Sequence, residues 1–218
     1  MIGIDWGTTS LRAYRMDGHT VLERTELPLG ITTIAPTRFG PALQQAVGAW
    51  LKHGDLRILL SGMIGSRQGW VEAPYLPCPA GLDDLAGSLA PVPWPGLQIM
   101  IVPGLSAADE SGVPEVMRGE EVQILGTAGL DADCIVCLPG SHSKWVQMAG
   151  GRIAGFTTHL TGEAFAALRQ HTILAKMIAD DAPHDADAFR RGVLRSGEPG
   201  GLLHHAFGVR SLGLFGQL

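Results

Sequence analysis

Apolar and polar positions near the start of the chain follow two different spacings. Residues 2–5, 11–16 and 21–27 are short runs in which apolar side chains cluster or alternate with polar ones, as they do in β-strands. Apolar side chains then recur at helical spacing across residues 41–53, and residues 57–60 form the largely apolar run of a buried strand. This order predicts three strands, a helix and a fourth strand.

Prolines and glycines interrupt the pattern in the middle of the chain. Residues 69–95 hold many of both, so we expect an extended excursion there, with a short helix at residues 82–89. Residues 99–102 predict another buried strand, and a polar loop is expected after Pro103-Gly104. Residues 119–126 then predict a helix that has acidic residues in its first turn.

The strand pattern of the opening returns in the second half. Residues 134–138, 144–148 and 152–156 predict three strands, and glycine-containing turns separate them. A second three-strand start implies a second lobe. The predicted domains are therefore residues 1–130 and residues 131–218.

The end of the chain is patterned less clearly. A helix is expected from residue 163 to about residue 179, and residues 180–201 are predicted to be a polar connection. Residues 204–218 are apolar without a clear period, and nothing in them indicates the end of a domain. We therefore expect an incomplete second lobe, whose uncovered face makes the chain associate with itself or with a partner.

Composition places the chain among globular proteins that bind small ligands. Of 218 residues, 45% are hydrophobic and 17% are charged. The net charge of −5 and the scattering of the 16 basic residues argue against nucleic-acid binding, which needs clustered lysine and arginine. No apolar run approaches the roughly 18 residues that span a bilayer, and the N-terminus lacks a leader pattern. We therefore predict a cytoplasmic protein with no membrane partner.

The three cysteines are predicted to stay reduced. Cys78, Cys134 and Cys137 are too few, and odd in number, for a disulfide framework. Cys134 and Cys137 form a C-x-x-C, but strand geometry sends positions three apart to opposite faces. Core packing is therefore favoured over metal or redox chemistry for this pair.

Two polar turns carry the candidate chemistry. Asp5-Trp-Gly-Thr-Thr-Ser10 follows the first strand, where its glycine lets a backbone N–H approach a phosphate, its hydroxyls can donate to phosphate oxygens, and Asp5 can hold hydrated Mg²⁺. Taken alone, such a hexapeptide is also typical of an ordinary polar turn. Pro139-Gly-Ser-His-Ser-Lys144 occupies the equivalent turn of the second lobe. We therefore expect two hydroxyl-rich hairpins that face each other across a cleft.

These motifs resemble one family of the actin-like ATPase superfamily, the 2-dehydro-3-deoxygalactonokinases. The first turn is similar to the first phosphate-binding motif of that superfamily. Six segments match the family in order: Ile4-Asp-Trp-Gly-Thr-Thr9, Gly62-Met-Ile-Gly-Ser66 with Gly69-Trp70, Ala73-Pro-Tyr-Leu76, Met117-Arg-Gly-Glu-Glu121, Pro139-Gly-Ser-His-Ser-Lys-Trp145 and Thr161-Gly-Glu163.

The resemblance implies an α/β protein with the actin-like ATPase (ribonuclease H-like) fold, in which two lobes with mixed sheets close over ATP and Mg²⁺. The implied activity is transfer of the γ-phosphate of ATP to the terminal hydroxyl of 2-dehydro-3-deoxy-D-galactonate. The implied nucleotide-binding residues are Gly7, Thr8, Thr9, Ser10, Gly140, Ser141, His142, Ser143 and Lys144. The implied sugar-acid-binding residues are Gly62, Met63, Ser66, Arg67, Trp70, Tyr75 and Arg118.

Some of these roles have plain structural alternatives. Arg67 is a candidate partner for the substrate carboxylate, or simply a surface charge. Trp70 or Tyr75 would pack against the carbon chain, and the alternative for Trp70 is ordinary loop packing. Arg118 would steady a phosphate or the substrate, or form a local ion pair with the glutamates that follow it.

A general base is expected at the start of the helix that precedes the second lobe, because the resemblance places an aspartate there. This chain has Gly119-Glu-Glu-Val122 instead. Glu120 is the candidate and Glu121 its rival, and the alternative is that both only complement the positive end of the helix. Asp5 is the second catalytic candidate and the expected metal ligand.

Two other functions remain open at this point. The chain would be a catalytically impaired sugar-acid-binding protein if it lacks the adenosine-binding segment that the resemblance implies after residue 218. Alternatively, Ser141, His142 and Ser143 would form a hydrolase site, although no G-x-S-x-G elbow accompanies them.

Overall fold

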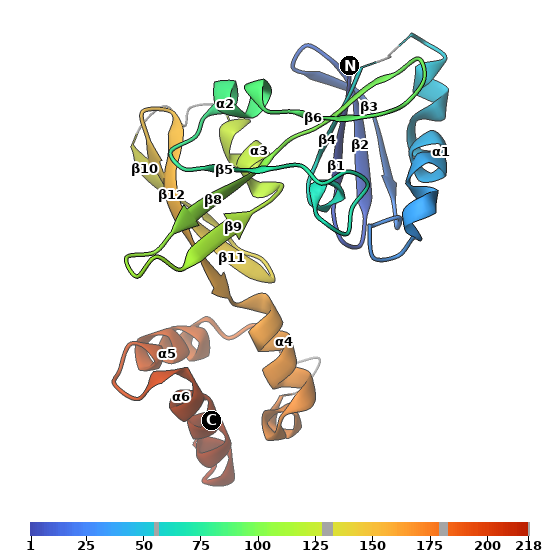
Figure 1. Ribbon diagram of the computed structural model, residues 1–218. Coiled ribbons are helices and arrows are strands. Elements are labelled where there is room, and N and C mark those ends of the chain that lie inside the picture. The colour runs from blue at the N-terminus through green and yellow to red at the C-terminus, as the bar shows by residue number, and fades with distance from the viewer. Residues whose placement is uncertain (55–56, 128–132, 179–182, 218) are drawn as a thin grey trace. The chain divides into compact units, whose positions relative to one another are not determined.

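The computed structural model describes residues 1–54, 57–127, 133–178 and 183–217, and it divides into two compact units (Figure 1). The first unit comprises Met1–Leu138 and Lys144–Thr158, and the second comprises Pro139–Ser143 and His159–Leu218. The two strands that link them, β11 (His142–Ala149) and β12 (Arg152–Leu160), each run from one unit into the other. No helix of the described residues is long and apolar enough to cross a membrane.

A six-stranded sheet forms the first half of the first unit, with strand order β3-β2-β1-β4-β7-β6. Its strands are β1 (Ile2–Trp6), β2 (Leu11–Asp17), β3 (Thr20–Leu27), β4 (Arg57–Ser61), β6 (Ala90–Val92) and β7 (Gln98–Ile101). β1 pairs antiparallel with β2 and parallel with β4, which in turn pairs parallel with β7. Because β1 and β4 run in the same direction side by side, both of their carboxyl ends reach the same edge of the sheet.

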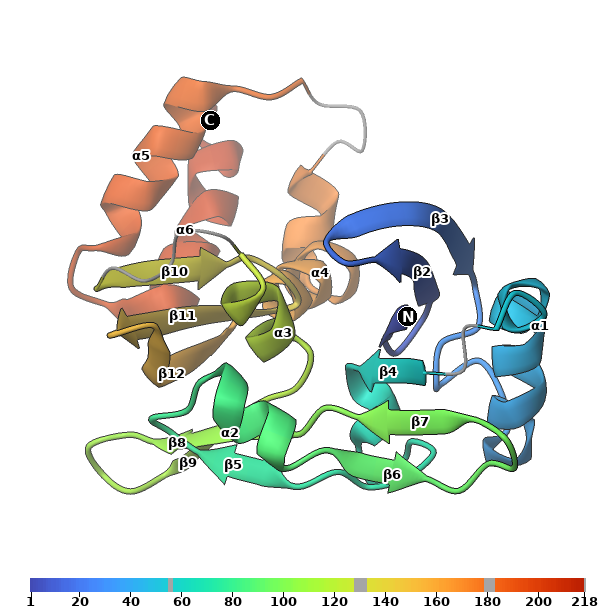
Figure 2. The same ribbon diagram turned by 90° about the horizontal axis from the view of Figure 1, so that it is seen from above.

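Helix α1 (Phe39–Leu51) follows the short helix η1 (Pro36–Arg38) and lies against the sheet (Figure 2). Its apolar positions recur at helical spacing, so one stripe is buried, and Phe39, Leu43 and Val47 are at most 1% exposed. Alternate residues of β1 are buried, as expected for a half-covered strand. Together they form the first apolar core, which fixes the position of the end of β1.

The rest of the first unit surrounds a second apolar core. A three-stranded sheet in the order β5-β8-β9 contributes to this core, as do two short helices and the sheet β10-β11-β12. The bounds are β5 (Tyr75–Pro77), β8 (Gly104–Ala108), β9 (Pro114–Met117), β10 (Cys134–Leu138), α2 (Leu82–Gly87) and α3 (Glu120–Leu125). Leu105, Val146 and Ile153 are fully buried in it, and Ile124 of α3 is buried in the same core, which ties α3 to both sheets.

The second unit consists of the hairpin at residues 139–143 and the helices that follow β12. They are α4 (Gly162–His171), η3 (Ile173–Met177), α5 (Ala186–Ser196) and α6 (Gly201–Leu214). Asp185 caps α5, because its side chain accepts the backbone N–H groups of Asp187 and Ala188.

The predicted strands and helices up to residue 102 are confirmed, but four later predictions differ from the structure. The polar loop expected after Pro103-Gly104 contains the hairpin of β8 and β9. The connection expected at residues 180–201 contains α5, and the unpatterned end from residue 204 belongs to α6. The helix expected from residue 163 to residue 179 ends earlier, since α4 stops at His171 and η3 follows.

The domain boundary and the cysteines complete the comparison. The predicted boundary at residues 130 and 131 lies outside the described residues. Core packing is confirmed for Cys134, which packs against the second core. It is wrong for Cys137, which is exposed because the side chains of β10 alternate between half-buried and exposed positions.

Candidate active site

The turn after β1 is held from behind by a second segment of chain. The Gly7 N–H donates to the Ser10 carbonyl at 3.0 Å, and the Thr8 carbonyl accepts both the backbone N–H and the hydroxyl of Thr32, at 3.0 and 2.6 Å. A Cβ on Gly30 would lie 2.1 Å from that same carbonyl, so only glycine fits there. The hydroxyl-bearing residues Thr8 and Thr9 remain exposed. The turn is therefore rigid and presents its polar side chains outward.

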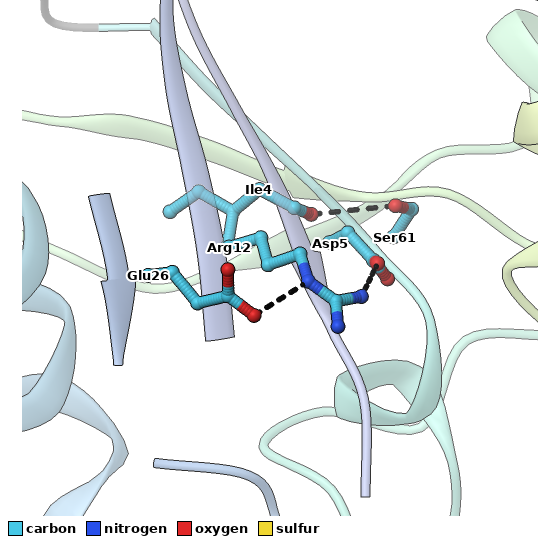
Figure 3. Close-up of polar contacts among 5 residues, drawn as sticks. All are labelled: Ile4, Asp5, Arg12, Glu26 and Ser61. Atoms are coloured by element: carbon cyan, nitrogen blue, oxygen red, sulfur yellow. Dashed lines mark hydrogen bonds and ion pairs between the residues drawn. The ribbon is translucent and has the colours of Figure 1, made fainter. Parts of the chain in front are cut away.

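Asp5 lies at the end of β1 and lines a cavity of about 480 Å³ within the first unit. Figure 3 shows the Arg12 guanidinium between two carboxylates, 3.4 Å from Asp5 and 2.9 Å from Glu26. Burial raises the pKa of Asp5 above its ordinary value, and the Arg12 charge opposes that shift. Nearby, the Ser61 hydroxyl donates to the Ile4 carbonyl at 3.3 Å, which joins the ends of β1 and β4.

Two glycines bring the start of α3 against these strand ends. Gly62 has φ 87° and Gly119 has φ 111°, a region that favours glycine. A Cβ on Gly62 would lie 2.9 Å from the Trp6 carbonyl and 3.1 Å from Asp5 Oδ1, and a Cβ on Gly119 would lie 3.1 Å from the Gly62 Cα. Larger residues would separate Asp5 from the helix that carries the candidate base.

The two glutamates of α3 have different surroundings. Both carboxylate oxygens of Glu121 accept the Gly119 N–H, at 2.9 and 2.8 Å, and the side chain is fully buried. Burial raises the pKa of Glu121 to about 7. Glu120 is half-buried, and its Oε2 accepts the Arg118 backbone N–H at 3.1 Å.

The orientation of α3 distinguishes these glutamates. Gly119, Val122 and Gln123 line the cavity beside Asp5. Successive residues of a helix are rotated by about 100°, so Glu121 points away from that face while Glu120 lies at its margin. Glu120 is therefore the nearer of the two glutamates to the cavity-lining face of α3, whereas Glu121 accepts the Gly119 N–H at the start of the helix.

Arg118 joins the loop of residues 62–75 to α3. Its side chain is 7% exposed, Nη2 donates to the Ala73 carbonyl at 2.8 Å, and Nε donates to the Tyr75 hydroxyl at 3.4 Å. The guanidinium also lies over the Tyr75 ring, 4.2 Å from its centre. Within the described residues, Arg118 Nη1 and the hydroxyl of Ser66 are buried without a hydrogen-bond partner. The predicted ion pair with the neighbouring glutamates is not what holds Arg118.

Trp70 and Arg67 have contrasting environments. Trp70 packs among Trp6, Phe39 and Trp94, with ring centres 5.7–6.4 Å apart, so the loop-packing alternative describes its observed contacts. The Arg67 side chain is 87% exposed and lies 3.5 Å from a Glu72 carboxylate oxygen. Met63 packs partly against the first core. Substrate contact by these side chains stays a prediction.

The hairpin of the second unit is built on the start of α4. The Gly140 carbonyl accepts the Gly162 N–H, and the Ser143 hydroxyl lies 2.5 Å from the Thr161 hydroxyl. His142 Nε2 lies 2.6 Å from Glu163 Oε2. In this part of the structure neither Ser141 nor Ser143 is hydrogen-bonded to His142, so the geometry gives the hydrolase interpretation no support.

The Lys144 ammonium does not lie among the polar side chains of that hairpin. Its ammonium is buried in the first unit, where it donates to the Val116 carbonyl at 2.8 Å and to the Thr158 hydroxyl at 2.9 Å. This lysine therefore links β11 to β9 and β12. That the two hairpins face each other stays a prediction, since they belong to different units.

Sequence reasoning missed four residues that support these turns and strand ends: Arg12, Gly30 and Ser61 in the first unit, and Glu163 in the second. Arg12 alternates with apolar residues in β2, which places it on the same face as Asp5, and that register could have been predicted from the turn length. Gly30 and Glu163 make contacts across more than 20 residues of chain, and no local pattern indicates such contacts.

Comparisons with known proteins give one consistent family. Residues 5–218 match the family model of 2-keto-3-deoxy-galactonokinase. The chain is 42% identical over 193 residues to a probable 2-dehydro-3-deoxygalactonokinase of Rhizobium meliloti, covering 87% of this chain and 61% of that protein. It is 33% identical over 217 residues to the 2-dehydro-3-deoxygalactonokinase of Escherichia coli, covering 100% of this chain and 72% of that protein.

A solved structure agrees with these matches. A crystal structure of a Sinorhizobium meliloti protein assigned to the 2-dehydro-3-deoxygalactonokinases superimposes with a TM-score of 0.87 at 38% identity, over 100% of this chain and 73% of that one. The predicted resemblance and the predicted α/β class are confirmed. The chain spans about three fifths to three quarters of the length of these relatives.

Proposed function

Because the chain belongs to the 2-keto-3-deoxy-galactonokinase family, we propose that it transfers the γ-phosphate of ATP to the terminal hydroxyl of 2-dehydro-3-deoxy-D-galactonate. The proposal rests on one observation: the ends of β1 and β4 and the start of α3 lie close together in the first unit. Gly62 after β4 lies close to both Asp5 at the end of β1 and Gly119 before Glu120, and Asp5 and Gly119 line the same cavity. A phosphate-binding turn, a substrate loop and a candidate base thus converge at one edge of the sheet.

In the proposed reaction, the terminal hydroxyl oxygen of the sugar acid forms a bond to the γ-phosphorus, and the bond from that phosphorus to the oxygen bridging to the β-phosphate breaks. The hydroxyl proton passes to the carboxylate of Glu120, and ADP leaves. Glu120 Oε2 accepts the Arg118 backbone N–H at 3.1 Å, and the Glu120 carboxylate is the group proposed to act as the general base. Glu121 keeps the start of α3 in place through Gly119.

The donor set at the first turn fits Mg²⁺. That ion binds through one or two carboxylates and keeps several waters, and Asp5 offers one half-exposed carboxylate beside the cavity. When bound, Mg²⁺ would neutralise charge on the nucleotide phosphates. Thr8, Thr9 and the Gly7 backbone, held by the segment at residues 30–32, would orient those phosphates.

The sugar acid is proposed to bind against the loop of residues 62–75. Arg118 binds this loop through the Ala73 carbonyl and the Tyr75 hydroxyl, and the exposed guanidinium of Arg67 would be available to a carboxylated carbon chain.

Location and association are part of the same proposal. A cytoplasmic setting suits the three free thiols of the chain. Self-association is supported by large apolar side chains that the second unit leaves mostly exposed, namely Phe189, Leu194, Leu203, Phe207 and Phe215. Sedimentation at several protein concentrations tests the association, and a monomer at all of them would contradict it.

A coupled assay of ADP release tests the proposed activity. We expect ADP release that needs both Mg²⁺ and the sugar acid, and that saturates with the sugar acid. Release at the same rate with water as the only acceptor would indicate an ATPase, and would contradict the kinase proposal. Asp5→Asn is the matched inactive control, because it keeps the size of the side chain while removing its charge.

A further inference from the structure

The hairpin of residues 139–143 and the first turn of α4 form one hydrogen-bonded block. The Gly140 carbonyl accepts the Gly162 N–H and the Thr161 hydroxyl, both at 3.1 Å. The Ser141 carbonyl accepts the Glu163 N–H at 3.2 Å. Two N–H groups that usually lack partners at a helix start are therefore satisfied by the hairpin itself.

The contact is close enough to select residue types. A Cβ on Gly162 would lie 2.7 Å from the Gly140 carbonyl oxygen and 3.0 Å from the Ser141 Cα. The Ser143 hydroxyl, which is buried, accepts the Gly140 N–H at 3.3 Å and lies against the Thr161 hydroxyl. Any displacement of the helix start would consequently move the hairpin backbone.

One exposed side-chain pair in this block contributes little to the stability of the fold. His142 Nε2 lies 2.6 Å from Glu163 Oε2, although the two side chains are 52% and 62% exposed. Exposed pairs of this kind contribute little to stability, typically about 0–1 kcal/mol. The pair does have a geometric effect, because a carboxylate that accepts the Nε2–H fixes the plane of the ring and leaves the Nδ1 edge for another partner.

The structure assigns Glu163 as a positioning residue for the nucleotide, and this inference rests on the proposed function. We propose that Glu163 holds the His142 ring so that its Nδ1–H donates to a phosphate oxygen of MgATP or MgADP. With Glu163 on one side and a phosphate on the other, the imidazolium form carries both protons needed for the two hydrogen bonds. Glu163 itself does not contact the nucleotide.

A double-mutant cycle measures whether Glu163 acts through His142. Calorimetric titration of the full chain with MgATP is carried out for wild type, Glu163→Gln, His142→Asn and the double variant. We expect each single change to weaken MgATP binding by about tenfold, the lower end of the range for residues that orient a ligand-binding histidine. The double variant should bind no more weakly than His142→Asn, because the two residues act as one unit.

The matched control is Glu198→Gln. Glu198 is another exposed glutamate of the second unit, and it pairs with Arg195. We expect its replacement to leave MgATP binding unchanged. Binding of the sugar acid should be unchanged in all variants, which separates a positioning role from a general loss of structure.

Several outcomes would overturn the inference. Additive losses would mean that Glu163 does not act through His142, and unchanged MgATP binding in Glu163→Gln, or no MgATP binding by the wild-type chain, would remove its role. Phosphate transfer to the sugar acid is measured separately. Transfer without coupling between the two residues refutes only this inference, whereas coupling without transfer refutes only the proposed activity.

Discussion

Replacing Glu121 by glutamine should change how stability depends on pH. Burial raises the pKa of Glu121 from an ordinary value of 4.5 to about 7. Between these two values the unfolded chain has released the proton and the folded chain still holds it, so the folded state becomes less stable as pH rises. Below that window both states are protonated, and above it both are ionised, so the dependence is confined to roughly pH 4.5–7.

The size of the effect follows from the shift. A difference of about 2.5 pKa units, at 1.36 kcal/mol each, corresponds to a loss of about 3 kcal/mol between the two ends of the window. Glutamine cannot ionise, so Glu121→Gln should lack this loss. It also offers one oxygen where the carboxylate offers two to the Gly119 N–H, which adds a cost that does not depend on pH.

Urea unfolding of both proteins at pH 5, 6, 7 and 8 isolates the ionisation. We expect the free energy of unfolding of Glu121→Gln, relative to wild type, to increase by about 2–3 kcal/mol from pH 5 to pH 8. Gln123→Ala serves as the control, because it changes a residue of the same helix without adding or removing an ionisable group, so its variant should keep the wild-type pH dependence. A difference between Glu121→Gln and wild type that stays constant with pH would refute the claim that a buried, protonated carboxyl supports the start of α3.

Four further predictions concern the site itself. Asp5→Asn should abolish turnover in the ADP-release assay, and near-normal activity would remove its proposed role with Mg²⁺. Glu120→Gln should lower kcat by about 10²-fold with little change in substrate affinity, whereas a larger effect of Glu121→Gln would move the base to that residue. Trp70→Ala should destabilise the first unit by about 3 kcal/mol in urea unfolding because it opens the aromatic cluster, and a loss of sugar-acid affinity without destabilisation would favour direct contact. Arg67→Ala should raise the KM for the sugar acid about tenfold if the exposed guanidinium pairs with its carboxylate, and an unchanged KM would leave Arg67 as a surface charge.

The strands of the first sheet were predictable because their burial alternates within a few residues. Ile2, Ile4 and Trp6 are buried on one face of β1, and the same period is visible in the sequence. Helix α5 shows the opposite case. Residues 186–196 contain three arginines and one aspartate, and apolar residues such as Phe189 remain exposed, so composition indicated a connection while the Asp185 cap favours a helix. Helix α6 has apolar residues around its circumference and contains three glycines, which hide its period.

The site was predictable where a motif constrains the backbone and not where a side chain reaches across the fold. The glycines at positions 62 and 119 mark close approaches that only glycine permits, and the matching motifs identified both. Lys144 belongs to a motif that resembles a phosphate-binding turn, yet its ammonium donates hydrogen bonds to the Val116 carbonyl and the Thr158 hydroxyl. Arg118 binds Ala73, 45 residues earlier in the chain, and no local pattern encodes such a contact.

Identification of the reaction product tests the central claim most directly. The chain is incubated at high concentration with ATP, Mg²⁺ and 2-dehydro-3-deoxy-D-galactonate, with Asp5→Asn in parallel, and the products are analysed by mass spectrometry. The proposed function predicts a sugar acid that carries one phosphoryl group on its terminal carbon, in an amount equal to the ADP formed, and none with Asp5→Asn. ADP accompanied only by inorganic phosphate, or a phosphorylated product that forms equally with Asp5→Asn, would contradict it.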